Sequence, residues 1–341
     1  MRLAQEVSYS NAGTVEYLFD VGGSNGFFFL ELNPRLQVEH PVTEMITRVN
    51  LPACQLQVAM GIPLHRIPDI RKLYGRPAFS TSTIDFEEEQ QVPTGGHCIA
   101  ARITAENPDL GFQPTSGLIE ELNFRSTPDV WGYFSVDSSG LVHEFADSQF
   151  GHLFAGGADR EAARKSMIMA LKELSIRGDI RTTVEYLVTL MQSDDFISNR
   201  ITTAWLDSRI ASPAVAQRDM HRPSPLFVVA HGALVTAFQA TEARSAQFVA
   251  TLGKGHYPPE ALLTVDQPIE LIYEDVKYQL RAAQTGAPGF AISCPPSLEY
   301  VQGEVRQLSD GGFLVQLAGK SQVVYSTVTP AGLRLTMQGR T

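Results

Sequence analysis

Three polar positions within apolar runs near the start of the chain hold the side chains best suited to chemistry. Glu16 lies in the run TVEYLF, and Glu31 and Asn33 lie in FFFLELN, with the residues GGSNG between the two runs. Glycine, serine and asparagine tolerate the positive φ and the local hydrogen bonds of hairpin turns, so we expect a β-hairpin. With the turn between Gly23 and Ser24, Glu16 faces Glu31 across the two strands.

This pairing predicts a site for a divalent cation. Strand alternation places Phe29, Glu31 and Asn33 on one face of the hairpin, beside Glu16. Like charges directly opposite each other are destabilising by up to about 1 kcal/mol, so a cation between them is favoured. Two carboxylates and an amide oxygen suit Mg²⁺ or Mn²⁺, which also bind water and substrate phosphates. The alternative from spacing alone is two exposed strand glutamates with Asn33 in a turn.

The segment PRLQVEH that follows favours the functional interpretation. Arg35, Gln37, Glu39 and His40 supply a cation, an amide, a third carboxylate and an imidazole within six residues. An extended backbone after Asn33 would send Arg35, Gln37 and Glu39 to one side. That side is suited to a small anion.

The elements that must position these residues follow from periodicity and turn residues. The run LPACQLQVAMG predicts a short helix with Gly61 after its end. Apolar spacing predicts further helices over residues 159–178, 184–192 and 202–210. After residue 224, strands are predicted at LFVVAHGALVTAF, IELIYEDVKYQLRAA and GGFLVQLAG, with one helix at RSAQFVATLG. The fold class is therefore α+β.

Composition excludes several classes of protein. The 341 residues are 43% hydrophobic and 19% charged, which is typical of globular chains of two or three domains at roughly 100–200 residues each. The net charge of −10 disfavours nucleic acid as a partner, because phosphate binding needs clustered cations. The sequence has neither an apolar run of about 18 residues nor a basic and apolar leader, so we expect no membrane partner.

The three cysteines indicate a reducing compartment. Cys54, Cys98 and Cys294 are far apart and lack CxxC spacing, so neither a disulfide framework nor a zinc site is expected. We therefore expect a cytoplasmic protein.

The stretch FLELNPRLQVEHPVTE, with GTVEYLF upstream, resembles the biotin carboxylase signature of biotin-dependent carboxylases. The stretches NLPACQLQVAMGIPLHRI, GHCIAARITAENPD and ALKELSIRGDIRTTVEYL resemble the large multidomain acetyl-CoA carboxylases of eukaryotes, from residue 1 to about 210. Beyond that point, PLFVVAHGALVTAF and VRQLSDGGFLVQLAG resemble, more weakly, the central region before the biotinyl domain of that enzyme.

The resemblance implies the C-terminal part of an ATP-grasp biotin carboxylase, followed by a mostly β central domain. It divides the chain into the C-terminal part of the ATP-grasp domain (1–60), a connector (61–96), the biotin carboxylase C-terminal domain (97–210), a linker (211–224) and the acetyl-CoA carboxylase central domain (225–341).

The resemblance also implies roles for the polar residues of the hairpin. Glu16, Glu31 and Asn33 match residues that hold the divalent metals, Mg²⁺ or Mn²⁺, on the phosphates of ATP. Arg35 matches the catalytic arginine that stabilises the negative charge developing on biotin, and it is also expected to contact bicarbonate.

The next residues of the signature match the bicarbonate site. Gln37 and Val38 match the segment that contacts bicarbonate. Glu39 matches the general base that removes the proton of bicarbonate before it attacks the γ-phosphate of ATP.

The resemblance leaves the biotin pocket less defined. Asp147 matches a position near this pocket, although an aspartate at a strand end fits equally well. Bacterial relatives have a second biotin-contacting arginine near the segment VWGYFSV, but no arginine lies between Trp131 and Asp147 here. We interpret Arg102 as a structural ion-pair partner.

The implied activity is ATP- and bicarbonate-dependent carboxylation of biotin, the first half-reaction in making malonyl-CoA from acetyl-CoA for fatty acid synthesis. The expected partners are ATP, bicarbonate, a biotinyl domain outside these residues, the rest of the carboxylase chain and further copies of it in a homo-oligomer. No Gly-rich phosphate loop precedes the hairpin in these residues, so we expect them to be inactive alone. The alternatives are a non-catalytic scaffold or interaction module derived from a carboxylase and another carboxylase or ligase of the ATP-grasp family.

Overall fold

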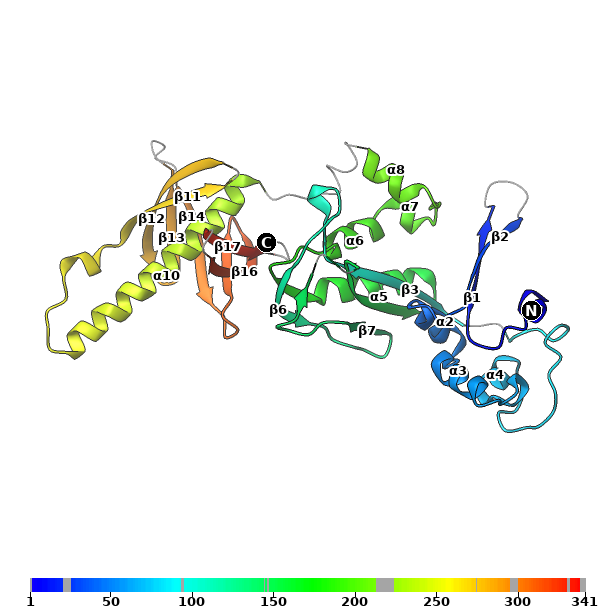
Figure 1. Ribbon diagram of the computed structural model, residues 1–341. Helices are drawn as coiled ribbons and strands as arrows, with labels where there is room; N and C mark the ends of the chain where they lie inside the picture. Colours follow the sequence, from blue (N-terminus) through cyan, green and yellow to red (C-terminus); the bar gives the residue numbers. More distant parts are fainter. Residues whose placement is uncertain are drawn as a thin grey trace. The chain divides into compact units, whose positions relative to one another are not determined.

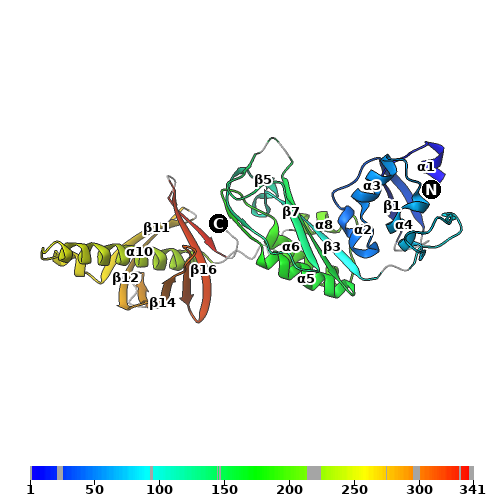
Figure 2. The same ribbon diagram turned by 90° about the horizontal axis from the view of Figure 1, so that it is seen from below.

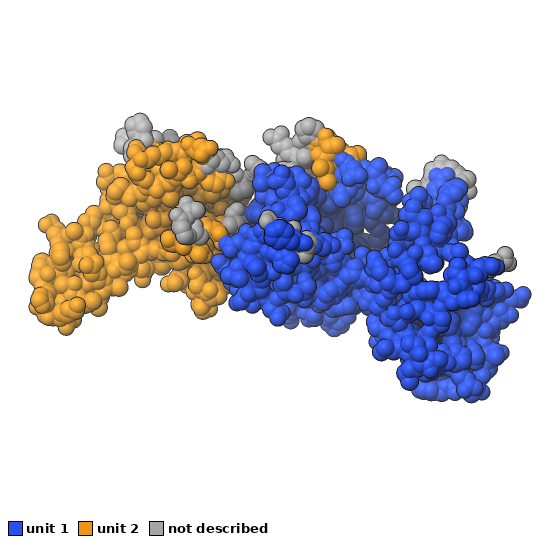
Figure 3. All heavy atoms as spheres, in the orientation of Figure 1, with its two compact units in different colours: residues 1–207 blue, residues 208–341 orange. Residues whose placement is uncertain are grey.

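A computed structural model places most of the chain in two compact units. It describes residues 2–20, 26–92, 95–143, 145, 147–212, 224–273, 275–294, 300–329 and 332–337. Residues 1–207 form unit 1 and residues 208–341 form unit 2 (Figure 3). The predicted turn at Gly23 and Ser24 and most of the predicted linker lie outside the described residues, and the predicted domain bounds stay a prediction.

Unit 1 begins with a β-hairpin and a group of short helices (Figure 1). These elements are α1 (Arg2–Glu6), β1 (Thr14–Phe19), β2 (Phe27–Asn33), α2 (His40–Thr47), α3 (Leu51–Ala59), η1 (Leu64–Arg66) and α4 (Pro68–Leu73). Helix α3 confirms the helix expected from LPACQLQVAMG. The Asn50 side chain caps its start by accepting a hydrogen bond from Ala53 N, and Gly61 follows its end with φ +78°.

The hairpin has the predicted pairing at its chemically important end. Glu16 lies opposite Glu31, as expected. A β-bulge after Glu16 then shifts the register by one residue, so that Tyr17 pairs with Phe29. The bulge turns Phe29 to the face opposite Glu31, and the prediction that these two share a face is wrong. The ring of Tyr17 meets that of Phe29 edge-to-face at 6.1 Å.

The central part of unit 1 is a three-stranded antiparallel sheet with strand order β3-β9-β7. Its elements are β3 (His97–Thr104), β7 (Val130–Phe134), β9 (Gln149–Gly157) and the helix α5 (Arg160–Glu173). Helix α5 packs on one face of this sheet (Figure 2), where Ile103, Leu153 and Met167 are fully buried in a common core. Strand alternation sends the intervening side chains to the opposite face.

A three-stranded sheet, a two-stranded sheet and further helices follow, and the last of these helices runs past Asp207, the end of unit 1. They are β4 (Glu106–Asn107), η2 (Pro108–Leu110), β5 (Gln113–Pro114), β6 (Gly117–Asn123), β8 (Leu141–Val142), β10 (Ser175–Gly178), α6 (Val184–Met191), α7 (Asp194–Ile197) and α8 (Trp205–Ala211). The helices predicted over 184–192 and 202–210 are confirmed by α6 and α8. The helix predicted over 159–178 is too long, because Ser175–Gly178 leaves the helix to pair with β6.

Unit 2 combines one long helix with a seven-stranded antiparallel sheet. The elements are α10 (Pro225–Gly253), η3 (Glu260–Leu263), β11 (Asp266–Tyr273), β12 (Val276–Gly286), β13 (Gly289–Ser293), β14 (Tyr300–Gln307), β15 (Phe313–Leu317), β16 (Lys320–Thr329) and β17 (Gly332–Met337). Each strand pairs with its neighbour in the chain.

Helix α10 overturns the strand predicted at LFVVAHGALVTAF. The Ser224 side chain accepts a hydrogen bond from Phe227 N, and Pro225 occupies the first helical position. Val229, Ala233 and Ala237 are buried at helical spacing in the core of the unit. The prediction failed because a short apolar run has no clear period, and its burial against the sheet decides between helix and strand.

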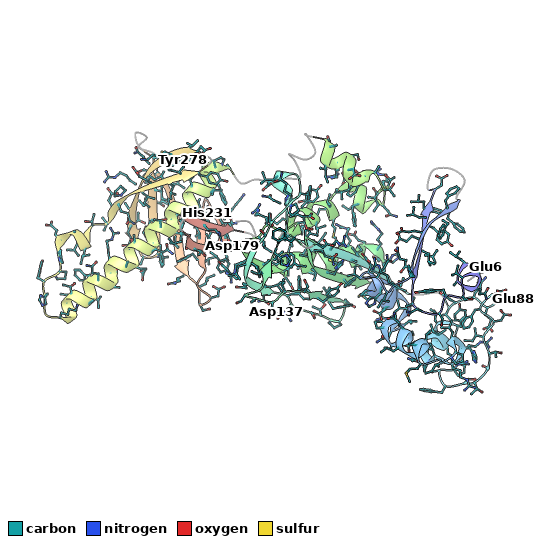
Figure 4. All side chains as sticks on the ribbon, in the orientation of Figure 1. Glu6, Glu88, Asp137, Asp179, His231 and Tyr278 are labelled. Carbon is teal, nitrogen blue, oxygen red and sulfur yellow. The ribbon has the colours of Figure 1, made fainter. Side chains whose placement is uncertain are left out.

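By length and composition alone, α10 passes as a helix able to cross a membrane. Its first half, however, lies against the sheet, as the central helix of a folded domain does (Figure 1). Figure 4 labels His231, a residue of α10 that is only 1% exposed. We assign α10 to the core of unit 2.

The sheet of unit 2 curls so that both of its edges reach α10. A Cβ atom at Gly232 would lie 3.3 Å from Leu271 of β11 and 3.2 Å from Leu335 of β17. These strands are the first and last of the sheet. Gly232 is therefore the point of the helix at which the two edge strands converge.

We expect Gly232→Leu to lower the free energy of unfolding of unit 2 by about 2 kcal/mol, because overpacking a filled core forces side chains and backbone apart. Urea unfolding of residues 1–341, followed by circular dichroism, measures the change. Gly253→Leu is the matched control, since no atom lies within 4 Å of a Cβ at that end of α10. Equal stability of the two variants would contradict the convergence at Gly232.

Candidate active site

Four polar side chains converge at the base of the hairpin. Asn33 Nδ2 donates hydrogen bonds to Glu16 Oε1 at 2.8 Å and to Glu31 Oε1 at 2.9 Å. Gln37 Nε2 donates to the same oxygen of Glu16 at 3.2 Å. The predicted convergence of the two carboxylates with Asn33 is confirmed, but the amide nitrogen rather than the expected amide oxygen faces them, and its protons offset the repulsion between the carboxylates.

The donor set fits a hard divalent cation. Mg²⁺ in nucleotide sites is held by one or two carboxylates and completes its shell with water and phosphate oxygens. Glu16 and Glu31 supply the two carboxylates, and Asn33 offers an amide oxygen once its amide group turns over. Within the described ranges, no group of three or more His, Cys, Asp and Glu side chains is arranged to hold a metal by itself. The site at the hairpin thus needs substrate oxygens to be complete.

The segment after Asn33 departs from the extended backbone expected from the sequence. Arg35 N donates to Asn33 O at 2.8 Å, and His40 N donates to Gln37 O at 3.2 Å. Glu39 has φ −85° and ψ 0° and stands directly before α2. The prediction of an extended backbone from Asn33 to Glu39 is therefore wrong, because the chain turns at Arg35 and again over Val38 and Glu39 before α2 begins.

The side chains of Arg35 and Glu39 are exposed and available to small molecules. Among the residues that the structure describes, neither side chain forms an ion pair or a hydrogen bond. Val38 lies between Gln37 and Glu39 in the turn and is half-buried. A cation and a carboxylate thus face solvent within six residues of Asn33 in the chain.

Contacts of α2 fix the position of Glu39. Glu44 Oε1 accepts a hydrogen bond from Leu51 N at 2.7 Å, and its other oxygen lies 2.6 Å from His40 Nδ1, although not in a hydrogen-bonding direction. Met45 Sδ lies 3.3 Å from Cys98 Sγ of β3. These contacts attach α2 to α3 and to the β3-β9-β7 sheet, on the face away from α5.

That face carries three polar residues side by side. The register places His152 of β9 opposite Arg102 of β3 and opposite Tyr133 of β7. Burial raises the pKa of Tyr133 and lowers the pKa of His152. The negative charge of Glu39 raises both pKa values and the positive charge of Arg102 lowers both. Glu39 and Arg102 therefore lie near the same pair of rings.

Arg102 is the functional candidate whose role the sequence interpretation missed. Its side chain is exposed, and no carboxylate among the described residues lies within 4.0 Å of its guanidinium group. Within the described part of the chain, Arg102 is therefore not the structural ion-pair partner that the sequence interpretation expected. The alternation in AARIT, with Ala101 and Ile103 buried and Arg102 exposed, is a signal that points Arg102 away from the core.

Asp147 lies two residues before β9. Its Oδ1 accepts a hydrogen bond from Gln149 N at 3.0 Å, which is the geometry of an aspartate that opens a strand. Its assignment to a biotin pocket stays a prediction.

Three family descriptions match successive parts of the chain. Residues 1–67 match "Carbamoyl-phosphate synthase L chain, ATP binding domain", residues 100–208 match "Biotin carboxylase C-terminal domain" and residues 224–341 match "Acetyl-CoA carboxylase, BT domain".

Solved structures of biotin-dependent carboxylases are also similar to this chain. The biotin carboxylase domain of the Hydrogenobacter thermophilus 2-oxoglutarate carboxylase is 29% identical, with a TM-score of 0.51 over 62% of this chain and 41% of that one. The pyruvate carboxylase of Rhizobium etli is 28% identical, with a TM-score of 0.52 over 63% of this chain and 19% of that one. The fold and the site thus define a chain of the biotin-dependent carboxylases, with an ATP-grasp biotin carboxylase part.

Curated relatives identify the family within this class of carboxylases. Acetyl-CoA carboxylase of Dictyostelium discoideum is 51% identical over 347 residues, which cover 100% of this chain and 15% of the relative. Acetyl-CoA carboxylase of Saccharomyces cerevisiae is 47% identical over 354 residues, with the same coverage. The chain belongs to the acetyl-CoA carboxylase family, and it spans 15% of the length of these relatives.

Proposed function

We propose that this chain contributes to the carboxylation of biotin by ATP and bicarbonate within an acetyl-CoA carboxylase. The observation that carries the proposal is the shared hydrogen bonding of Asn33 with Glu16 and Glu31, directly before the exposed Arg35 and Glu39. This order along the chain, with two carboxylates and an amide followed by an exposed cation and an exposed carboxylate, supports the proposal.

The hairpin forms the nucleotide end of the site. Glu16, Glu31 and Asn33 would hold Mg²⁺ or Mn²⁺ on the phosphates of ATP. When bound, the ion supplies positive charge that lowers the repulsion between the phosphates and an incoming anion. Gln37 binds Glu16 and so keeps one carboxylate oriented toward the shared point.

The segment 35–39 forms the bicarbonate end. Gln37 and Val38 contact bicarbonate, and Arg35 balances its charge. Glu39 accepts the proton of bicarbonate, while a bicarbonate oxygen bonds to the γ-phosphorus of ATP and the bond to the ADP oxygen breaks. The products of this step are carboxyphosphate and ADP. Both charged side chains are exposed, as binding of a substrate from solvent requires.

The face of the β3-β9-β7 sheet that lies away from α5 forms the biotin end. Carboxyphosphate breaks down to CO₂ and phosphate, the released phosphate takes the proton from N1 of biotin, and N1 bonds to the carbon of CO₂. Arg35 stabilises the negative charge that develops on biotin. We assign the role of the second biotin-contacting arginine to Arg102, because its exposed guanidinium and Glu39 both act on Tyr133 and the segment VWGYFSV has no arginine of its own. Asp147 is the further candidate for this pocket.

The remaining expectations concern the setting of the reaction. We propose that biotin arrives on a biotinyl domain outside these residues, and that the carboxyl group passes on to acetyl-CoA to give malonyl-CoA for fatty acid synthesis. The same proposal includes a homo-oligomeric enzyme in the cytoplasm.

The test is bicarbonate-dependent release of phosphate from ATP in the presence of free biotin. We expect turnover by the full-length protein and none by residues 1–341 alone. A catalytically dead scaffold would give no turnover in either sample. Another ATP-grasp ligase would cleave ATP without a requirement for biotin, and either outcome would overturn the proposal.

We expect Glu31→Gln to weaken the binding of Mg²⁺-ATP to the full-length protein by about tenfold, or about 1.4 kcal/mol, because the amide removes one of two negative charges paired against the metal. Isothermal titration with a non-hydrolysable ATP analogue measures the affinity. Glu88→Gln is the control, since Glu88 is an exposed side chain distant in sequence from the hairpin (Figure 4). Equal affinity of the two variants would contradict a role for Glu31 as a metal ligand.

A further inference from the structure

We propose that Gln149 is a positioning residue for the carboxylation of biotin, which acts by fixing the ring of His152 between Arg102 and Tyr133. The inference rests on the proposed function and deepens it. It assigns a role to two residues that the reaction described above does not use.

A hydrogen bond links the two residues. Gln149 Nε2 lies 2.9 Å from His152 Nδ1. The amide nitrogen is a donor only, so Nδ1 of the neutral ring is the acceptor and the ring proton lies on Nε2. The bond therefore selects one of the two neutral forms of the imidazole.

Stacking holds the ring in the same orientation. The His152 ring is stacked with Tyr133 at 5.8 Å and 21°, and with Phe154 at 5.8 Å and 13°. Trp131 stacks in turn on Phe154 at 4.9 Å. These four rings form one stacked layer. His152 is 1% exposed, so rotation of its ring would disturb the whole layer.

This layer of rings lies next to Glu39 and Arg102, the groups that we assign to the reaction. The register places Arg102 and Tyr133 directly beside His152 on the two neighbouring strands. The charged groups that act on His152 are Glu39, from the segment before α2, and Arg102, from β3. A shift of the His152 ring would therefore displace Arg102, the cation that we assign to biotin.

Packing alone does not require this polar pair. Two apolar side chains of similar shape would fill the layer without the cost of removing an amide and an imidazole from water. The hydrogen bond fixes a ring orientation and a protonation state, which an apolar pair would leave undefined. Both properties matter next to a general base and a cation.

Three variants of the full-length protein test the inference. Gln149→Leu removes the donor and keeps the approximate volume of the side chain. Gln149→Glu keeps a hydrogen bond but reverses it, because the carboxylate accepts from a proton on Nδ1. Gln113→Leu is the matched control, an exposed glutamine on strand β5 of the same unit.

We expect Gln149→Leu to lower kcat/KM for biotin by about tenfold, through misplacement of the biotin end, and to leave KM for Mg²⁺-ATP within about twofold. In Gln149→Glu, the new negative charge raises the pKa of His152. The protonated ring then competes for Glu39, and the acid limb of the pH profile moves to higher pH. If Gln149 only stabilised the fold, the acid limb of the pH profile would not shift.

The inference fails if Gln149→Leu matches Gln113→Leu in kcat/KM for biotin. It also fails if KM for Mg²⁺-ATP rises by as large a factor as kcat/KM for biotin falls. It also fails if the profile of Gln149→Glu is unshifted. Absence of biotin carboxylation by the unsubstituted protein would overturn the proposed function and the inference with it. If the unsubstituted protein and Gln149→Leu both turn over normally, the inference is overturned and the proposed function stands.

Discussion

Arg35→Ala is expected to lower kcat for biotin carboxylation by about 10²-fold or more, the typical loss on removing one positioned electrostatic group. Arg35 is exposed, and within the described part of the chain its guanidinium forms no ion pair, so its charge is free to act on substrate. The affinity for Mg²⁺-ATP should change little, because the ligands proposed for that end of the site are Glu16, Glu31 and Asn33. Steady-state kinetics with free biotin, together with nucleotide titration, separates the two effects.

The control for this experiment is Arg66→Ala, which removes a second exposed arginine of unit 1. Its kinetics should match those of the unsubstituted protein. A loss of ATP affinity in Arg35→Ala as large as the loss of turnover would show that Arg35 belongs to the nucleotide end, and the division between the two ends would be wrong.

Glu39→Gln is expected to abolish the bicarbonate-dependent formation of ADP, with a loss of about 10²–10⁴-fold for removal of a general base. The amide keeps the size of the side chain and its place before α2, but it cannot accept the proton of bicarbonate. Binding of Mg²⁺-ATP should persist. A coupled assay for ADP, with and without bicarbonate, measures the effect.

Glu88→Gln again provides a matched substitution with no expected effect on ADP formation. Bicarbonate-dependent turnover of Glu39→Gln within about tenfold of the unsubstituted protein would exclude Glu39 as the base, since loss of a base costs at least about 10²-fold. The acceptor of the proton would then have to be a different group of the site.

The sequence predicted the hairpin end of the site well. Turn residues and period-2 alternation are local signals, and together they were enough to pair Glu16 with Glu31. The bulge that follows has no local signal, because the extra residue in β2 is one more apolar residue in FFFLELN. Phe29 was consequently assigned to the wrong face.

The biotin end could not be built from the sequence in the same way. Arg102, Tyr133 and His152 come from three strands that are distant in the chain, and only their register brings them together. Helix α10 was missed for a related reason. The burial of Val229 and Ala233 against the sheet is a tertiary contact, and the local signal that did exist was the cap at Ser224.

The strand order of the two sheets has a consequence for how the chain folds. In unit 2 every strand pairs with the next one along the chain, so the sheet can grow one hairpin at a time with only short loops to close. In unit 1, β9 must pair with β3 across all of the strands from β4 to β8 before Arg102 and His152 meet. The entropy of closing that long loop makes formation of the biotin end the slower event in folding, and unit 2 is expected to acquire its sheet first.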